Sequence, residues 1–212
     1  MHLFMFDIDD TLVNSSGFED ECFTQAINRV IDKPIETDWS KYKHATDTGI
    51  IDEIIHTWGY SQRKDEIAEK IKNAFINNIK QHLSKSPANE IPGARSFLSY
   101  LSGRKDILLS IATGGWEETA KLKLDSAGID YKNIQFASSS DHHSRVGIMR
   151  CAERKHTTSA ILSKTYFGDA VWDKKASKEL GYMFILIGNK LHNEKRIENF
   201  EDIDQVMKLT GL

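Results

Sequence analysis

The 212-residue chain has only two cysteines and three prolines. The cysteines, Cys22 and Cys151, lie far apart in segments with helical patterns, which argues against a disulfide framework or a zinc site and favours reduced, buried thiols. No apolar run approaches the length of a membrane span, and the apolar start is too short for a secretory signal. We therefore expect a cytoplasmic protein without a membrane segment.

An excess of charge of one sign is also missing. The 28 basic and 31 acidic residues give a net charge of -3, so no broad basic surface points to nucleic acid as a partner. A content of 40% hydrophobic and 28% charged residues is typical of a folded globular protein. The length suits one substantial core, or a core that carries a smaller inserted domain. The oligomeric state stays unknown at this point.

Five short runs are apolar at nearly every position, which is typical of strands buried on both faces of a parallel sheet. They are Leu3–Phe6, Ile107–Ala112, Ile134–Ala137, Thr165–Phe167 and Met183–Ile187. Helical patterns separate the later runs, over residues 116–127, 146–152 and 174–180, with Gly128 and Gly181 as stops after the first and the last. The alternation predicts an α/β fold, a Rossmann-like parallel sheet wrapped by helices.

Residues 14–87 interrupt this alternation with three helical patterns and no convincing strand. The first begins at Ser16-Gly17-Phe18-Glu19, which has the spacing of a capping box, and the other two cover residues 50–58 and 67–79. Ser84–Pro92, with two prolines, is the expected return linker. We expect an α/β core of residues 1–13 and 88–212, with residues 14–87 inserted as a small α-helical cap.

The segment Phe6-Asp7-Ile8-Asp9-Asp10-Thr11-Leu12 places acids at the carboxyl end of the first strand, where ligands bind in open α/β sheets. Asp7 and Asp9 are two residues apart, so their side chains leave the same face while the strand persists. Carboxylates this close repel each other, which suits a shared proton or a hard metal ion. An alternative is that the acids simply end a strand and cap a turn.

Two further strands end in polar residues. Thr113, Gly114 and Gly115 offer a hydroxyl group and free backbone N–H groups that suit an anion, or simply an N-cap with turn glycines. Asp169 and Asp173 follow the fourth run and offer oxygen ligands for a cation, although Asp173 also suits the cap of the next helix.

Together these segments resemble the motifs of the haloacid dehalogenase-like hydrolases, a superfamily dominated by phosphatases. The first matches the D-x-D-x-T pattern of that family, the second its Ser/Thr phosphate motif, and Gly168-Asp169 with Asp173 its G-D-x-x-x-D metal motif. The resemblance implies that Asp7 is the nucleophile, and that Asp9 is the general acid/base and faces the metal with its backbone carbonyl. It also implies that Thr113 and Gly114 bind the substrate phosphate, and that Mg²⁺ is held by Asp7, Asp9, Asp169 and Asp173.

The chain departs from the family pattern at two positions. The family lysine is matched best by Arg145, which keeps the charge but presents a planar fork, and the family asparagine is replaced by Gly114. Lys121 and Lys123 are alternatives to Arg145 that we expect to be solvated. Lys33-Pro34 lies in the inserted segment and is excluded.

Several other residues have two interpretations. Thr46-Asp47-Thr48-Gly49 resembles the substrate-facing loop of the family's helical caps, or is an ordinary N-cap. Trp116 and Trp172 suit either the pocket wall or the core. His142-His143 is interpreted as part of a polar loop.

These observations predict a Mg²⁺-dependent phosphatase that hydrolyses a small phosphorylated metabolite through an aspartyl phosphate. One alternative is a sugar-phosphate mutase similar to β-phosphoglucomutase, which shares the motifs. Another is a non-catalytic ligand-binding protein, which the departures at Gly114 and Arg145 keep open. Dehalogenation is disfavoured, because it does not need the acid/base that Asp9 supplies.

Overall fold

The computed structural model describes residues 1–15, 17–157 and 160–212. Its centre is a six-stranded sheet with the order β5-β4-β1-β6-β7-β8, in which every neighbouring pair is parallel. The strands are β1 (His2–Phe6), β4 (Ile107–Ala112), β5 (Gln135–Ala137), β6 (Ser163–Gly168), β7 (Met183–Ile187) and β8 (Arg196–Ile197). The first strand therefore lies in the middle of the sheet, with its carboxyl end between those of β4 and β6.

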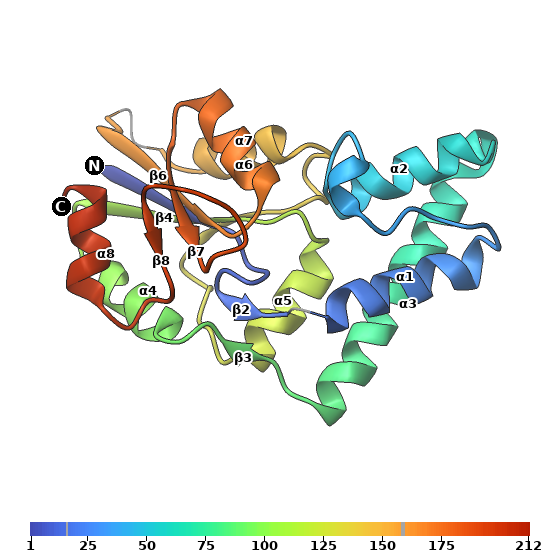
Figure 1. Ribbon diagram of the computed structural model, residues 1–212, viewed down its shortest axis with the longest axis horizontal. Helices are drawn as coiled ribbons and strands as arrows, with labels where there is room; N and C mark the ends of the chain where they lie inside the picture. The colour runs from blue at the N-terminus through green and yellow to red at the C-terminus, as the bar shows by residue number, and fades with distance from the viewer. Residues whose placement is uncertain (16, 158–159) are drawn as a thin grey trace.

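Helices cover both faces of the sheet, because side chains of β1 alternate between two apolar cores. Phe4 and Phe6 pack with α4 (Ala94–Ser102), α5 (Glu117–Ser126) and α8 (Ile203–Thr210), whereas Leu3 and Met5 pack with α6 (Arg145–Arg154) and α7 (Val171–Leu180). The result is a layered α/β/α core, with α6 and α7 above the sheet in Figure 1 and α4, α5 and α8 below it.

A separate helical unit, α1 (Phe18–Val30), α2 (Asp47–Thr57) and α3 (Lys64–Lys85), lies beside the carboxyl end of β1 (Figure 1). It has its own apolar core, which includes Phe23, Ile51 and Phe75, and two short 3-10 helices, η1 (Trp39–Lys41) and η2 (Ser61–Arg63). The chain enters and leaves this unit through an antiparallel pair of two-residue strands, β2 (Val13–Asn14) and β3 (Asn89–Glu90).

The structure confirms the Rossmann-like parallel sheet with inserted helices. All five expected strands are present, within two residues at each end. Helix α7 begins at Val171 rather than at Lys174, so Asp173 lies inside its first turn. The helices α4 and α8 and the strand β8 were not expected from the sequence, and neither were the short strands β2 and β3 or the 3-10 helices η1 and η2.

The structure also bears on three smaller expectations, which concern Ser16, the two cysteines and membrane-spanning helices. Ser16, the expected N-cap residue of the capping box, lies outside the described residues. Both cysteines are free; Cys22 is buried as expected, whereas Cys151 is only partly buried, which corrects the expectation of two buried thiols. No helix within the described residues has both the length and the apolar composition needed to cross a membrane.

Candidate active site

The chain turns sharply at the carboxyl end of β1, and the three acids of this turn, Asp7, Asp9 and Asp10, line one cavity. The Asp7 N–H still donates to the Phe167 carbonyl of β6, 2.9 Å away, which keeps Asp7 on the line of the sheet. The N–H groups of Leu12 and Val13 then both donate to the Ile8 carbonyl, at 2.8 and 2.9 Å, and close the turn.

Asp7, Asp169 and Asp173 form one carboxylate cluster, with one oxygen of each within 4.8 Å of the others. Asp7 ends β1 and Asp169 follows β6, while Asp173 reaches in from the first turn of α7. Gly168 makes this approach possible, because a Cβ atom there would lie only 2.7 Å from an Asp173 carboxylate oxygen. Residues far apart in the sequence are thus brought together as expected.

Burial disfavours the ionised form of the carboxylates in this cluster. Burial raises the pKa of Asp7, and Asp9 adds to this rise, although the Arg145 guanidinium opposes it. Burial and the charge of Asp7 raise the pKa of Asp169 to about 7. Three mutually close carboxylate oxygens fit a hard divalent cation such as Mg²⁺, which prefers oxygen ligands and would relieve the repulsion.

Arg145, the residue matched to the family lysine from the sequence, contacts two acids of the carboxylate cluster. Its Nη1 donates to Asp7 Oδ1 at 2.8 Å, and its Nε lies 3.3 Å from Asp173 Oδ1. Gly114 leaves room for this guanidinium, since a Cβ atom at that position would lie 2.7 Å from Arg145 Nη2. The two departures from the family pattern are therefore linked sterically: the arginine fills space that a side chain at residue 114 would need.

Thr113 is fully buried at the carboxyl end of β4, beside the strand that carries Asp7. Its Oγ1 accepts a hydrogen bond from the Gly115 N–H at 3.2 Å, so the hydroxyl closes the turn before α5. Thr113, Gly114 and Gly115 all line the same pocket as Asp7. Both interpretations of Thr113 are thus compatible with its position.

The Asp9 side chain is not part of the carboxylate cluster. It pairs with the Lys123 ammonium, which also pairs with Glu19 and is completely buried. The expectation that Lys123 is solvated is therefore wrong. The helical spacing explains the error, because Lys123 lies on the buried stripe of α5 with Ala120, Leu124 and Ala127. A role of Asp9 towards a cation would be limited to its backbone carbonyl.

The surroundings shift the pKa values of Asp9 and Glu19 in opposite directions. Burial acts to raise the pKa of Asp9, but the Lys123 charge and hydrogen bonds from Glu19 and Lys123 outweigh it and lower this pKa. Burial and the negative charge of Asp9 raise the pKa of Glu19 well above its usual value. Of the two carboxyl groups, Glu19 therefore holds a proton more readily than Asp9.

The start of α2 contacts the core at several points. The Asp47 N–H donates to the Gly114 carbonyl, and the Trp116 N–H donates to Asp47 Oδ2, both at 2.8 Å. The hydroxyls of Thr46 and Thr48 donate to the carbonyls of His143 and Ser139, at 2.6 and 2.8 Å. Thr46 is also the N-cap of α2, so both interpretations of this segment agree with its position.

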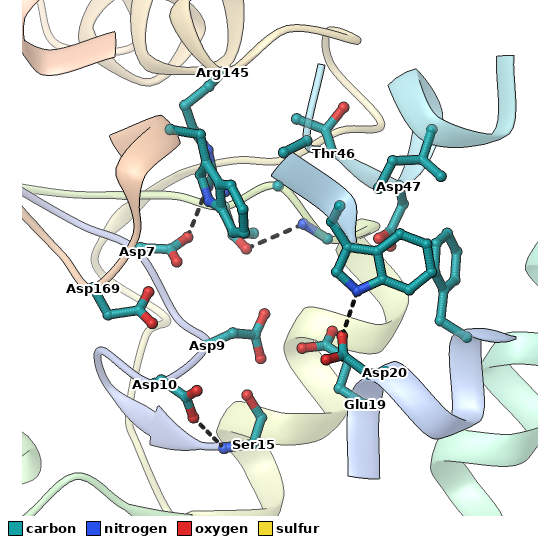
Figure 2. Close-up of a pocket in the computed structure, with 18 of the residues that line it drawn as sticks. Asp7, Asp9, Asp10, Ser15, Glu19, Asp20, Thr46, Asp47, Arg145 and Asp169 are labelled. Carbon is teal, nitrogen blue, oxygen red and sulfur yellow. Dashed lines mark hydrogen bonds and ion pairs between the residues drawn. The ribbon is translucent and has the colours of Figure 1, made fainter. Parts of the chain in front are cut away.

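A cavity of about 170 Å³ lies between the helical unit and the carboxyl edge of the sheet. In Figure 2, Asp7, Asp9, Asp10 and Asp169 lie on one side of it, and Glu19, Asp20 and Asp47 on the other. Trp172 lines the cavity, whereas Trp116 is buried in the core of the helical unit. His142 and His143 lie in the loop before α6, with stacked rings 4.5 Å apart.

Four charged residues of the site were not assigned to it from the sequence: Glu19, Asp20, Lys123 and Lys190. Lys190 follows β7 and pairs with Asp10 and with Asp169, the latter at 2.6 Å. Its position just beyond the carboxyl end of a strand is a signal that could have identified it. Glu19 and Asp20 carry no such signal, because their approach depends on how the helical unit packs.

The core is a parallel sheet with buried carboxylates at its carboxyl edge, and a helical unit faces these carboxylates. This is the architecture of a Rossmann-like α/β protein with an inserted helical unit. The family model of the haloacid dehalogenase-like hydrolases matches residues 4–187. The chain belongs to this family.

Solved structures agree with this fold. A β-phosphoglucomutase from Clostridium difficile superposes with a TM-score of 0.75 at 16% identity, covering 100% of this chain and 97% of that one. CbbY from Rhodobacter sphaeroides, in complex with phosphate, gives 0.70 at 13% identity, with 96% of each chain covered. A hydrolase from Pseudomonas syringae gives 0.71 at 20% identity, covering 99% and 90%. No match was found among curated proteins.

Proposed function

We propose that the protein is a Mg²⁺-dependent phosphatase that hydrolyses a small phosphate monoester, with Asp7 as the nucleophile. The observation that carries the proposal is the convergence of Asp7, Asp169 and the fully buried Asp173 in one carboxylate cluster, of which Asp7 and Asp169 line the cavity. Arg145 and the Thr113-Gly114-Gly115 turn lie at the same cavity and supply a positive charge and backbone N–H groups for a phosphate.

The reaction would proceed in two displacements at phosphorus. An Asp7 carboxylate oxygen forms a bond to phosphorus as the bond from phosphorus to the leaving oxygen breaks, and the leaving alcohol takes up a proton. Glu19 holds a proton more readily than Asp9 and is hydrogen-bonded to it, so Asp9 would pass a proton from Glu19 to the leaving oxygen and return to its ionised form. Water then gives a proton to Asp9 and attacks phosphorus, which breaks the Asp7–phosphate bond and releases inorganic phosphate.

The ion would be held by Asp7, Asp169 and Asp173, with the Asp9 carbonyl as the further ligand implied by the family resemblance. Bound Mg²⁺ supplies charge neutralisation, which lets a carboxylate approach a phosphate dianion. Arg145 contributes to the same end, because its guanidinium contacts both Asp7 and Asp173.

Residues 14–87 would act as a cap over this site. Hydrogen bonds join Thr46, Asp47 and Thr48 at the start of α2 to the core, which fits a closed arrangement in which the cap limits both water access and substrate size. The antiparallel β2–β3 pair connects the cap to the core and would act as its hinge.

A mutase function is less well supported by the cavity. A mutase must hold the phosphates at both ends of a bisphosphate intermediate, which requires cations at two places. Among the described residues that line the cavity, the cations are Arg145 and Lys190, and both lie near the carboxylate cluster. The cap side offers carboxylates instead.

The direct test is hydrolysis of a generic aryl phosphate by the wild-type protein and by Asp7→Asn, with Mg²⁺ and after its removal by a chelator. We expect activity only for the wild type with Mg²⁺, and an unchanged circular dichroism spectrum for the variant. Equal activity of Asp7→Asn would refute the assignment, and no activity in any arm would favour a non-catalytic binding protein.

A further inference from the structure

We propose that the leaving group of the substrate carries a positively charged nitrogen, so that the natural substrate is the phosphate ester of a small amino alcohol or amino sugar. This inference rests on the proposed phosphatase function and names the substrate class that the cap side of the cavity would accept. It draws on the balance of charge around the cavity and on the aromatic rings in its wall.

The cap side of the cavity is acidic and has no counter-charge of its own. Among the described residues that line the cavity, the cap contributes Glu19, Asp20 and Asp47 and no lysine or arginine. Glu19 is accounted for, since it is paired with Lys123. No cation of the described residues lies within ion-pair distance of Asp20 or Asp47.

Hydrogen bonds hold both of these carboxylates at the cavity. The Trp39 indole N–H donates to Asp20 Oδ1 at 2.7 Å, and the Trp116 backbone N–H donates to Asp47 Oδ2 at 2.8 Å. Burial of Asp47 in this position raises its pKa to about 7. Asp47 is the more strongly desolvated of the two, whereas Asp20 is exposed at the mouth of the cavity. A fixed carboxylate with no cation in ion-pair contact gains from a ligand that brings one.

Aromatic rings supply a second and independent preference. Trp39, Phe23 and Trp172 all line the cavity, and the bond from Trp39 to Asp20 fixes the indole beside a carboxylate. A ring face next to an anion attracts a cation, particularly an amino or quaternary ammonium group, and also packs against the methylene groups that carry it. Neither the acidic side chains nor the aromatic rings favour a second phosphate or a carboxylate at the far end of the substrate.

Substrate charge provides a direct test, because three esters of nearly equal size differ only at the far end. They are O-phosphoethanolamine, which ends in an ammonium, 2-hydroxyethyl phosphate, which ends in a hydroxyl, and 2-phosphoglycolate, which ends in a carboxylate. We expect kcat/KM to fall in that order, with roughly a tenfold advantage of the first over the second, since a partly exposed ion pair and one cation–π contact together contribute about that much.

The acids are tested by changing their charge and little else. In the double variant Asp20→Asn/Asp47→Asn, the preference for the ammonium ester over the hydroxyl ester should fall to roughly threefold or less. Glu21→Gln is the matched control, because Glu21 is exposed on the same helix as Asp20, bonds to Gln25 and does not line the cavity. It should keep the wild-type preference.

The outcomes separate this inference from the phosphatase proposal. If none of the esters and no aryl phosphate is hydrolysed, the phosphatase proposal fails, but the affinities of the three esters for Asp7→Asn, measured by calorimetry with Mg²⁺, still rank the end groups. Equal or reversed affinities, an equal or higher kcat/KM for 2-phosphoglycolate, or an unchanged preference in the double variant would each overturn the inference.

Discussion

Replacement of Lys123 by methionine tests whether a buried ammonium holds Asp9 in its place. The Lys123 side chain has no exposed surface and contacts two carboxylates, whose side chains are 24% exposed for Asp9 and 18% for Glu19. Methionine fills similar space on the apolar stripe of α5 but leaves Asp9 without a cation. Removal of one partner from a buried ion pair costs about 3–5 kcal/mol, and we expect about 2–4 kcal/mol here because both carboxylates keep some contact with water.

The assay is urea unfolding at neutral pH, together with the rate of ester hydrolysis. The matched control is Lys121→Met on the same helix, because Lys121 is 41% exposed and its ion pair with Glu117 contributes about 0.5 kcal/mol or less. Hydrolysis should fall by about 100-fold in Lys123→Met, since Asp9 loses its fixed position as acid/base. Equal unfolding free energies and equal rates for the two variants would refute this account of Lys123.

Three further changes probe other parts of the site. Arg145→Lys keeps the charge but loses the fork that contacts Asp7 and Asp173, so the inhibition constant of inorganic phosphate should rise about tenfold; an unchanged constant would contradict a phosphate-binding role. Gly114→Ala places a methyl group 2.7 Å from Arg145 Nη2, so kcat should fall about tenfold with a stability loss of about 1–3 kcal/mol, whereas wild-type kinetics would show that the guanidinium is free to move. The Asp47 pKa of about 7 lies above its ordinary value of 3.8, so the folded protein binds this proton more tightly and loses stability as the pH rises between these values. Asp47→Asn should therefore gain about 1–3 kcal/mol on the wild type between pH 4 and pH 8 in urea unfolding; a pH-independent difference would contradict the shift.

The parallel sheet and its site were largely predictable because they depend on local signals. Runs such as Ile107–Ala112 are apolar on both faces, and only a sheet covered by helices buries both. Asp7, Thr113 and Asp169 each follow such a run, and the carboxyl ends of neighbouring parallel strands meet at one edge. Their convergence therefore follows from the order of strands and polar residues along the chain.

The remainder depends on packing between segments that no local pattern describes. Lys123 looked like a solvated lysine between two leucines, although its spacing from Ala120 and Ala127 placed it on the buried stripe. Its partner Glu19 had a sufficient local explanation in the capping-box spacing. The missed helices α4 and α8 are short, with nine and eight residues. Their apolar positions can be recognised as a buried face only once the aromatic core around Phe97 and Phe200 is known.

The central claim is that Asp7 attacks phosphorus, and chemical trapping tests it most directly. The wild-type protein would be mixed with substrate and Mg²⁺, quenched in acid within the first turnover, and treated with borohydride, which reduces an aspartyl phosphate to homoserine. Peptide mass spectrometry should then find homoserine at position 7 and at no other aspartate. Substrate turnover with unmodified Asp7, or with the modification at another residue, would contradict the account.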